Sequence, residues 1–173
     1  MIPLALAAET GMEERVLIAL SEALESSFPV EVRRVPPVGV PPEAYDAARG
    51  QHSAPLVLRA LLSDCDPAMP KVLGLVEQDL FIPMLTFVFG QAQLGGRGAL
   101  VSVARLQQEF YGLPHNEELL IARTCKEAVH EVGHLWGLIH CESPLCAMRL
   151  STTIWNLDMK SARLCAACGE KTR

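Results

Sequence analysis

The sequence has no excess of basic residues and no long apolar run, and we do not expect its first residues to be a secretory leader. Its 173 residues carry 15 lysines and arginines against 20 aspartates and glutamates, a net charge of −5, so no basic surface that holds nucleic acid is expected. The longest apolar run, Leu80 to Gly90, is interrupted by Pro83 and Thr86 and is too short to cross a bilayer. The apolar first eight residues contain no lysine or arginine, unlike a signal peptide. We therefore expect neither nucleic acid nor membrane as a partner.

The hydrophobic content and the cysteines indicate which class of protein this is. Half of the residues are hydrophobic, enough for one domain of ordinary size with a buried core. Six cysteines would suggest disulfides in a secreted protein, but four have metal-ligand spacing, and Cys65 and Cys125 lie in apolar stretches with a helical pattern. We therefore expect a protein of the reducing cytoplasm, and we expect a monomer.

The run from His130 to His140, H-E-V-G-H-L-W-G-L-I-H, carries the clearest chemical signal. His130 and His134 are four residues apart, so on an α-helix they lie about 40° apart around the axis and about 6 Å apart along it. Both imidazoles can therefore reach one metal ion. Glu131 lies about 100° round from His130, where its carboxylate can act on a water molecule without becoming a ligand. This is the position of a general base.

The sequence also supplies a third ligand. Gly137 can adopt a positive φ, which would end the helix and let His140 approach the metal from outside it. Three imidazoles and one open position are what a catalytic zinc site needs, because the open position holds water. Two histidines on an apolar helix could also be core residues, but the added glutamate, glycine and third histidine at fixed offsets argue against that interpretation.

Four cysteines follow the histidines. They have the count and pairing of a closed tetrahedral site, which is structural because no position is left for water. Two disulfides or an iron centre are the alternatives, since four thiolates do not choose the metal; zinc is favoured because nothing suggests a redox partner. A short C-terminal segment buries little core, so a metal would staple it. The four residues are Cys141, Cys146, Cys165 and Cys168.

These residues resemble a known family. The histidine run matches the metzincin signature H-E-x-x-H-x-x-G-x-x-H without a mismatch. The cysteines, with Met148 two residues after the second of them, make the chain similar to the archaemetzincins, whose hallmark is that signature joined to a four-cysteine metal site. The resemblance covers Val129 to Cys168. The sixteen residues between Met148 and Cys165 are one fewer than in the family pattern, a loop change that leaves the ligands in place.

The resemblance implies a fold and an activity. The fold is expected to be α+β with an α/β-like N-terminal part: a compact metzincin-like arrangement with a twisted mixed sheet, an antiparallel edge strand and backing helices that include the zinc-binding active-site helix. Residues 1–137 would form an N-terminal subdomain, and residues 138–173 a small zinc-stapled C-terminal subdomain. The implied function is hydrolysis of peptide bonds by a zinc metallopeptidase with two Zn²⁺ ions, one catalytic and one structural.

The resemblance also gives roles to single residues. The three histidines would bind the catalytic zinc, and Glu131 would take a proton from the attacking water. Met148 would form a hydrophobic turn beneath the histidines. Some metzincins place an oxyanion-stabilising tyrosine near this turn, but the only tyrosines, Tyr45 and Tyr111, precede Met148, so that role stays unassigned.

Patterns upstream and downstream of the signature alternate between strand and helix. Thr10 to Glu13 has the form of a capping box. Residues 36–51 are expected to form a surface loop that links elements or partly covers the site. Trp136 and Trp155 are expected to be aromatic residues of the core or of the cleft wall. The wholly apolar run 72–76 should be a central strand. We expect further strands at 2–8 and 30–35, and helices at 12–27, from Ser53 to about 64, from Asn116 through the signature, and at 158–166.

Two strand-like runs, 86–93 and 99–106, are joined by a glycine-rich turn and predict a hairpin that provides the antiparallel edge. In metzincins an extended substrate pairs with such an edge strand above the zinc. The resemblance therefore assigns substrate binding to Gly90, Gln91, Ala92, Gln93 and Leu94. An ordinary hairpin that closes the sheet fits the strand propensities equally well.

Two other function classes fit the same residues. A metal-dependent hydrolase of non-peptide substrates would have the same ligands and base. A zinc-stabilised interaction protein would keep the cysteine site and carry a weakly metallated histidine site. Turnover that depends on Glu131 separates an enzyme from an interaction module, and a substrate profile separates the two kinds of hydrolase.

Overall fold

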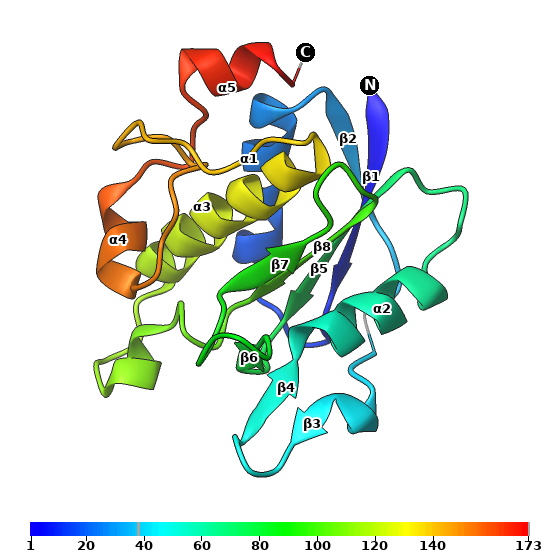
Figure 1. Cartoon of the computed structure of the whole chain (residues 1–173), viewed down its shortest axis with the longest axis vertical. Helices are drawn as coiled ribbons and strands as arrows, with labels where there is room; N and C mark the ends of the chain where they lie inside the picture. The colour runs from blue at the N-terminus through cyan, green and yellow to red at the C-terminus, as the bar shows by residue number, and fades with distance from the viewer. Residues whose placement is uncertain (38, 173) are drawn as a thin grey trace.

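A five-stranded mixed sheet runs through the molecule, with helices on both of its faces (Figure 1). The computed structural model describes residues 1–37 and 39–172. The edge strand β7 is antiparallel to its neighbour β8, and the other pairs are parallel, which confirms the predicted mixed sheet and the central place of β5. The strand order is β2 (Val30–Arg34), β1 (Ile2–Ala8), β5 (Lys71–Val76), β8 (Gly98–Ser102) and β7 (Gly90–Ala92).

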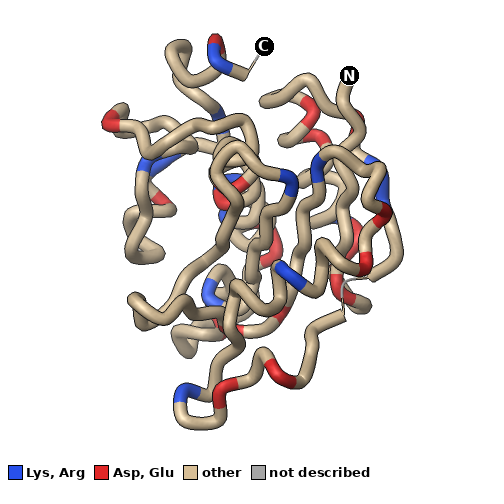
Figure 2. Tube along the Cα trace, turned by 45° about the vertical axis from the view of Figure 1, so that its right-hand side comes forward, with Lys and Arg blue, Asp and Glu red and all other residues tan. Residues whose placement is uncertain are grey.

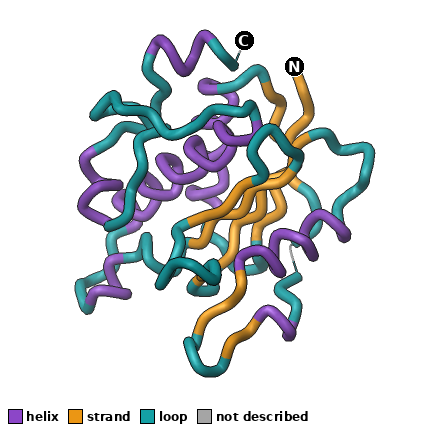
Figure 3. The backbone as a smooth tube through the Cα atoms, in the orientation of Figure 1, coloured by secondary structure: helices purple, strands orange, loops and turns teal. Residues whose placement is uncertain are grey.

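Helices α1 (Glu14–Ser27) and α3 (Glu117–Leu135) lie side by side on one face of the sheet, and α2 (Ala54–Asp64) covers the other (Figure 3). Side chains alternate between the faces with the period of two that a strand imposes. Leu4 and Leu6 of β1 join the core with α1 and α3, whereas the small residues Ala5 and Ala7 join the core with α2. Two separate apolar layers therefore hold the sheet between the helices.

A second, three-stranded sheet lies below the first (Figure 1) and consists of β3 (Tyr45–Asp46), β4 (Gln51–Ser53) and β6 (Leu80–Phe81). Most of the predicted 36–51 loop belongs to this region, including the 3₁₀ helix Pro42–Ala44; Val38 lies outside the described residues. Among the described residues of 36–51, none lines the cleft around the histidines. Of the two roles expected for this segment, it therefore links elements and does not cover the site.

Several local predictions also need correction. Helix α1 begins after Glu13 without a side-chain cap, because Gly11, with φ of 102°, places a turn where the capping box was expected. The predicted helix at 158–166 is instead two helices, α4 (Ile154–Met159) and α5 (Ala166–Glu170). Thr153 caps α4 by accepting a hydrogen bond from the Asn156 backbone N–H, so this helix begins earlier than predicted. The hairpin strands are shorter than predicted.

The surface carries charges of both signs, and acidic and basic residues are interspersed along the described trace (Figure 2). Trp136 stacks on Phe28 with ring centroids 5.0 Å apart, as a core aromatic should. Trp155 is 76% exposed on α4, so its prediction as a core or cleft-wall residue is wrong. Within the described residues, no helix has the length and apolar character needed to span a bilayer.

Candidate functional site

Helix α3 carries two of the three histidines and is fixed at both ends. At its start, Asn116, where the helix was predicted to begin, caps it: Asn116 Oδ1 accepts a hydrogen bond of 2.9 Å from the Leu119 backbone N–H. At its end, Gly137 has φ of 77°, and the Leu138 N–H bonds back to the Gly133 carbonyl over 3.1 Å. This is a Schellman ending, which only glycine adopts without strain. The chain therefore reverses after α3 and delivers His140.

The C-terminal end of α3 is also tied to the turn between β7 and β8. Lys71 Nζ donates to the carbonyls of Leu135 and Gly96 over 2.8 and 2.7 Å, and the Gly95 N–H donates to the His134 carbonyl over 2.8 Å. A cation at this position also interacts favourably with the negative end of the helix dipole. The edge strand and the histidine helix consequently hold a fixed relative position.

The three histidines converge, as the spacing predicted. His130 and His134 have their Nε2 atoms 3.2 Å apart, and one ligating nitrogen from each of the three rings lies within 4.8 Å of the others. Two zinc ligands at about 2.0–2.1 Å in tetrahedral geometry stand about 3.3 Å apart, so this spacing fits zinc. His130 is buried, whereas His140 is exposed and comes from the loop after α3.

Backbone carbonyls orient the two helical imidazoles. His130 Nδ1 lies 2.9 Å from the Ala147 carbonyl, and His134 Nδ1 lies 2.7 Å from the Leu138 carbonyl. If each Nδ1 donates its proton to its carbonyl, each Nε2 keeps a free lone pair that points into the cluster. Burial lowers the pKa of His134, and burial together with Lys160 lowers the pKa of His130 to about 2. Both rings are therefore neutral, which is the form that binds a metal.

Glu131 lies against the edge strand. A Cβ built on Gly90 would stand 2.7 Å from Glu131 Cγ and 2.6 Å from the Leu100 carbonyl oxygen, closer than real Cβ atoms come. Gly90 therefore leaves the space that the Glu131 side chain fills. Burial, followed by the neighbouring Glu127 carboxylate, raises the pKa of Glu131 well above its usual value. Strand β7 and helix α3 thus hold a dry carboxylate beside the histidines.

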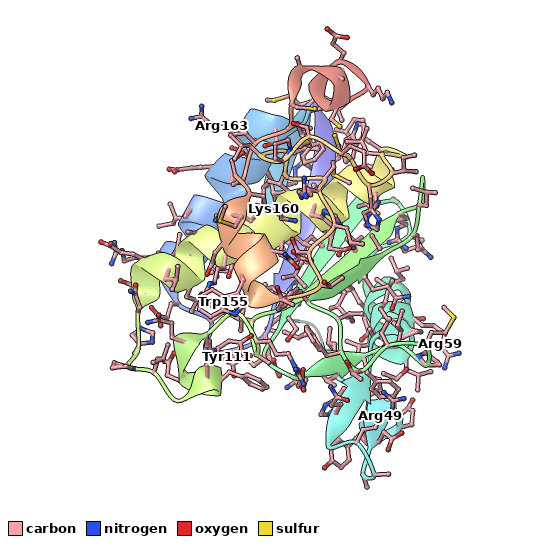
Figure 4. All side chains as sticks on the ribbon, turned by 60° about the vertical axis from the view of Figure 1, so that its left-hand side comes forward. Arg49, Arg59, Tyr111, Trp155, Lys160 and Arg163 are labelled. Carbon is pink, nitrogen blue, oxygen red and sulfur yellow. The ribbon has the colours of Figure 1, made fainter. Side chains whose placement is uncertain are left out.

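Two charged residues behind Glu131 were not predicted from the sequence. Glu127 is 5% exposed, and its Oε2 lies 3.9 Å from the ammonium of Lys160, which is 3% exposed. The Lys160 ammonium also donates to the Arg149 carbonyl over 3.0 Å and lies 3.4 Å from His130 Nδ1 (Figure 4). Glu127 could have been identified, because it precedes Glu131 by one helical turn. The sequence around Lys160 contains no signal.

Met148 lies directly beneath the histidine helix. It is fully buried, and a Cβ built on Gly133, between the two helical histidines, would clash with the Met148 sulfur. The residue before it, Ala147, supplies the carbonyl for His130. The segment that follows the second cysteine therefore supports the histidines both by packing and by a hydrogen bond.

A cleft of about 350 Å³ opens over the histidines and Glu131. One wall is the chain from Leu85 to Ala92, and the opposite wall is Leu150 to Thr152, which the sequence did not indicate. Of the five residues predicted to bind substrate, Gly90, Gln91 and Ala92 line this cleft. Gln93 and Leu94 lie beyond it in the turn, where Gln93 Oε1 accepts from the Gly98 N–H and Leu94 is 63% exposed.

The four cysteines form a second cluster. Their sulfurs lie within 4.8 Å of one another, and those of Cys141 and Cys165 are 3.8 Å apart. Zinc–sulfur bonds of about 2.3 Å in a tetrahedron place the sulfurs about 3.8 Å apart, so this donor set fits zinc. All six cysteines belong to the described part of the chain and none is in a disulfide. A backbone hydrogen bond from Cys168 is the main cause that lowers the pKa of Cys165 to about 7, which favours a thiolate ligand.

The segment between the cysteine pairs is bound to α3 by charged side chains. Arg123, 6% exposed, forms two hydrogen bonds of 2.8 and 2.7 Å with the Asp158 carboxylate and a third of 2.9 Å with the Leu106 carbonyl. Lys126 donates to the Asp158 carbonyl over 3.0 Å. Helix α4 is therefore docked on the histidine helix by contacts that do not involve either cluster.

Comparison with known proteins identifies close relatives. Residues 58–173 match the family model described as peptidase family M54. A protein named archaemetzincin from Methanocaldococcus jannaschii is 45% identical over 137 residues, which cover 79% of this chain and 74% of that protein. An archaemetzincin from Pyrococcus furiosus is 41% identical over 162 residues, which cover 90% of this chain and 84% of that protein.

Solved structures give the same result across nearly the whole chain. The crystal structure of an archaemetzincin from Methanopyrus kandleri superposes with a TM-score of 0.86 at 36% identity, covering 98% of this chain and 92% of that one. An archaemetzincin from Archaeoglobus fulgidus, complexed with malonate, gives a TM-score of 0.83 at 32% identity, covering 98% and 99%. The fold predicted from the resemblance is therefore confirmed.

Proposed function

From the premise that this chain belongs to the archaemetzincins, peptidase family M54, and is a zinc metallopeptidase, we propose which residues carry out the reaction. His130, His134 and His140 bind the catalytic zinc, and Glu131 is the catalytic base. The observation that carries this assignment is the convergence of the three imidazoles beside a buried carboxylate in one cleft. A zinc ion held there would act as a Lewis acid on the scissile carbonyl and acidify a water molecule.

Glu131 handles the proton during hydrolysis. Its carboxylate accepts the proton that water loses as the water oxygen forms a bond with the carbonyl carbon, and passes that proton to the amine nitrogen as the C–N bond breaks. Burial and the neighbouring Glu127 raise the pKa of Glu131, which makes it a stronger base than an exposed glutamate and supports the first of these steps. Glu127 and Lys160 form a buried ion pair behind it.

The edge strand β7 is proposed to bind the substrate backbone. The Phe89 carbonyl accepts from the Ser102 N–H and the Gln93 N–H donates to the Gly98 carbonyl, so these residues face β8. Because antiparallel pairing alternates, Gly90 and Ala92 direct their backbone polar groups to the open side. An extended peptide can pair with them along residues Gly90 to Leu94, and in this way present its scissile bond to the cleft.

We further propose that the four cysteines bind a second, structural zinc, for a total of two per chain. All four positions are protein ligands, so none is left for water. Residues 138–173 then form a zinc-stapled C-terminal subdomain beside the N-terminal part at 1–137, and Met148 forms its contact with the histidine helix. This organisation supports membership of the metzincin clan.

Substrate class and setting complete the proposal. The substrates are peptides or proteins, and the acidic net charge of −5 makes nucleic acid an unsuitable partner. Every ligand of both clusters comes from one chain, which supports function as a monomer. Thiolate ligands are kept in a reducing compartment, so we place the protein in the cytoplasm. The interaction-protein alternative is not favoured, because the relatives form a peptidase family.

Substitution of Glu131 tests the assignment. Glu131→Gln keeps the shape of the side chain but removes the base, and should lower kcat by about 10²–10⁴-fold while zinc content stays unchanged. Glu118→Gln, an exposed position on the same helix, is the matched control and should retain full activity. Cleavage of fluorogenic peptides and metal analysis provide the two measurements. A Glu131→Gln enzyme with wild-type turnover would show that the base is another group.

A further inference from the structure

We propose that the groove between α2 and the edge strand β7 is a second row of substrate subsites, which takes every other side chain of an extended peptide and favours acidic ones. The proposal rests on the pairing of substrate with β7 described above, and it assigns that pairing a sequence preference. Side chains from both elements line the groove, which has a volume of about 450 Å³: Leu58, Arg59 and Leu62 from α2, with Gln91 and Gln93 from the β7 side.

The groove and the histidine cleft meet at β7. Gln91 lines both hollows, so no other element separates them at this strand. The two hollows nevertheless belong to opposite faces of the sheet. Gly90 is paired with Val101, which lies in the core with α1 and α3, whereas Gln91 is paired with Leu100, which lies in the core with α2.

This register predicts where a bound peptide directs its side chains. Directly opposed residues of paired strands place their side chains on the same face, and successive residues alternate. Side chains opposite Gly90 and Ala92 would lie on the face of the sheet that carries the histidine cleft. The residue between them would lie on the same face as Gln91 and enter the groove beside α2.

The lining of the groove indicates which side chains fit. Arg59 is exposed on α2 (Figure 4), and its guanidinium forms no ion pair or hydrogen bond with any described residue. No aspartate or glutamate is among the described residues that line the groove, and the leucines provide an apolar wall. A glutamate side chain matches this arrangement, because its methylenes can pack on Leu58 and Leu62 while its carboxylate reaches the guanidinium.

Gln91 has an unpaired polar atom where the two hollows meet. Its Oε1 is buried and has no hydrogen-bond partner among the described residues. Buried polar atoms are nearly always paired, so an unpaired one at the junction of two hollows is consistent with a partner that arrives with a substrate. Ser151 Oγ, which lines the histidine cleft, likewise has no hydrogen-bond partner among the described residues.

The experiment scans a charge along a peptide. A fluorogenic peptide that the wild-type enzyme cleaves is resynthesised with glutamate or, as its neutral counterpart, glutamine at each successive position on either side of the scissile bond. We expect the Glu/Gln ratio of kcat/KM to rise to about two- to fivefold at alternate positions only, mostly through KM. Arg59→Gln should abolish this preference, and Arg59→Glu should reverse it in favour of lysine. Arg33→Gln, on the distant edge strand β2, is the matched control.

A second measurement separates this proposal from the proposed function. Binding of the same peptides to zinc-loaded Glu131→Gln, followed by fluorescence anisotropy, should show the same alternating, Arg59-dependent preference in Kd. Cleavage with a flat Glu/Gln ratio, or a ratio that Arg59→Glu does not change, would overturn the groove and leave the catalytic assignment intact. Alternating binding without any cleavage by the wild type would support the groove and overturn the catalytic assignment. If the experiments show no binding preference and no cleavage, both proposals are overturned.

Discussion

The histidine cluster and the cysteine cluster hold their ligands in different ways. His130 and His134 project from the 19-residue helix α3, and backbone carbonyls orient their rings independently of any metal. The cysteines come from loops and from the 5-residue helix α5, and two of them, Cys146 and Cys168, are themselves half of a small core completed by Leu138 and Met148. The first cluster is built by the fold, whereas the second contributes to building it.

This difference indicates which metal is needed for the reaction and which is needed for the fold. A site that is preorganised by packing and hydrogen bonds can lose its ion and keep its shape. When the ligands of a site take the place of a hydrophobic core, removal of the ion unfolds that part of the chain, because the free energy of metal binding there is free energy of folding. The role of each ion follows from what holds its ligands when the ion is removed.

The largest expected effect is on stability, and it is measured by removing one ligand from each cluster in turn. Cys168→Ser should lower the free energy of unfolding by at least ~3 kcal/mol and disorder the C-terminal segment. His140→Ala, at an exposed position, should cost about 1 kcal/mol or less when the histidine site is emptied in both proteins. Denaturant unfolding and near-ultraviolet circular dichroism measure both. Equal destabilisation by the two substitutions would remove the distinction.

A second substitution tests whether the histidine site can lose activity while both metals stay bound. Gly90→Ala inserts a methyl group where Glu131 Cγ and the Leu100 carbonyl leave no room. A displacement of the base by about 1 Å should lower kcat/KM by about 10²-fold, with zinc content unchanged. Gly169→Ala, where an added Cβ meets nothing within 4 Å, is the control. Wild-type kinetics in Gly90→Ala would mean that the strand does not position the base.

The smallest expected effect concerns the far end of the histidine helix. Asn116→Ala removes the side-chain cap of α3 and should lower the free energy of unfolding by about 1 kcal/mol. Because Arg123 and Lys126 bind α3 to α4 further along, zinc content and kcat should not change. Urea unfolding and a peptidase assay test this together. A parallel loss of catalytic zinc would show that the site depends on the cap.

Local patterns predicted most of the metal chemistry. Residues four apart on one helix share a face whatever surrounds them, so the placement of His130, His134 and Glu131 required only the helical period. The alternating strands and the central place of β5 followed from short apolar runs for the same reason. Gly137 was predicted to end the helix with a positive φ, and the structure confirms this.

What the sequence did not predict arises from contacts between distant segments. Lys160 reaches the histidine helix because Asp158, two residues before it, binds Arg123, and no periodic pattern encodes that contact. The chain after α4 stays extended because Ser161 bonds to the Leu145 carbonyl through both its N–H and its hydroxyl. The helix predicted across that point therefore could not form. The opposite wall of the cleft and the groove beside α2 likewise exist only once the layers have come together.

The order in which the two metals leave tests the division of roles most directly. Titration with a mild chelator, followed by zinc release, peptidase activity and circular dichroism in the same sample, should show that about one zinc per chain leaves first, because four thiolates bind zinc more tightly than three imidazoles. Activity should fall with that first zinc while the folded signal is retained, and the fold should be lost only with the second. Release of both metals together, or loss of the folded signal with the first zinc, would contradict the account.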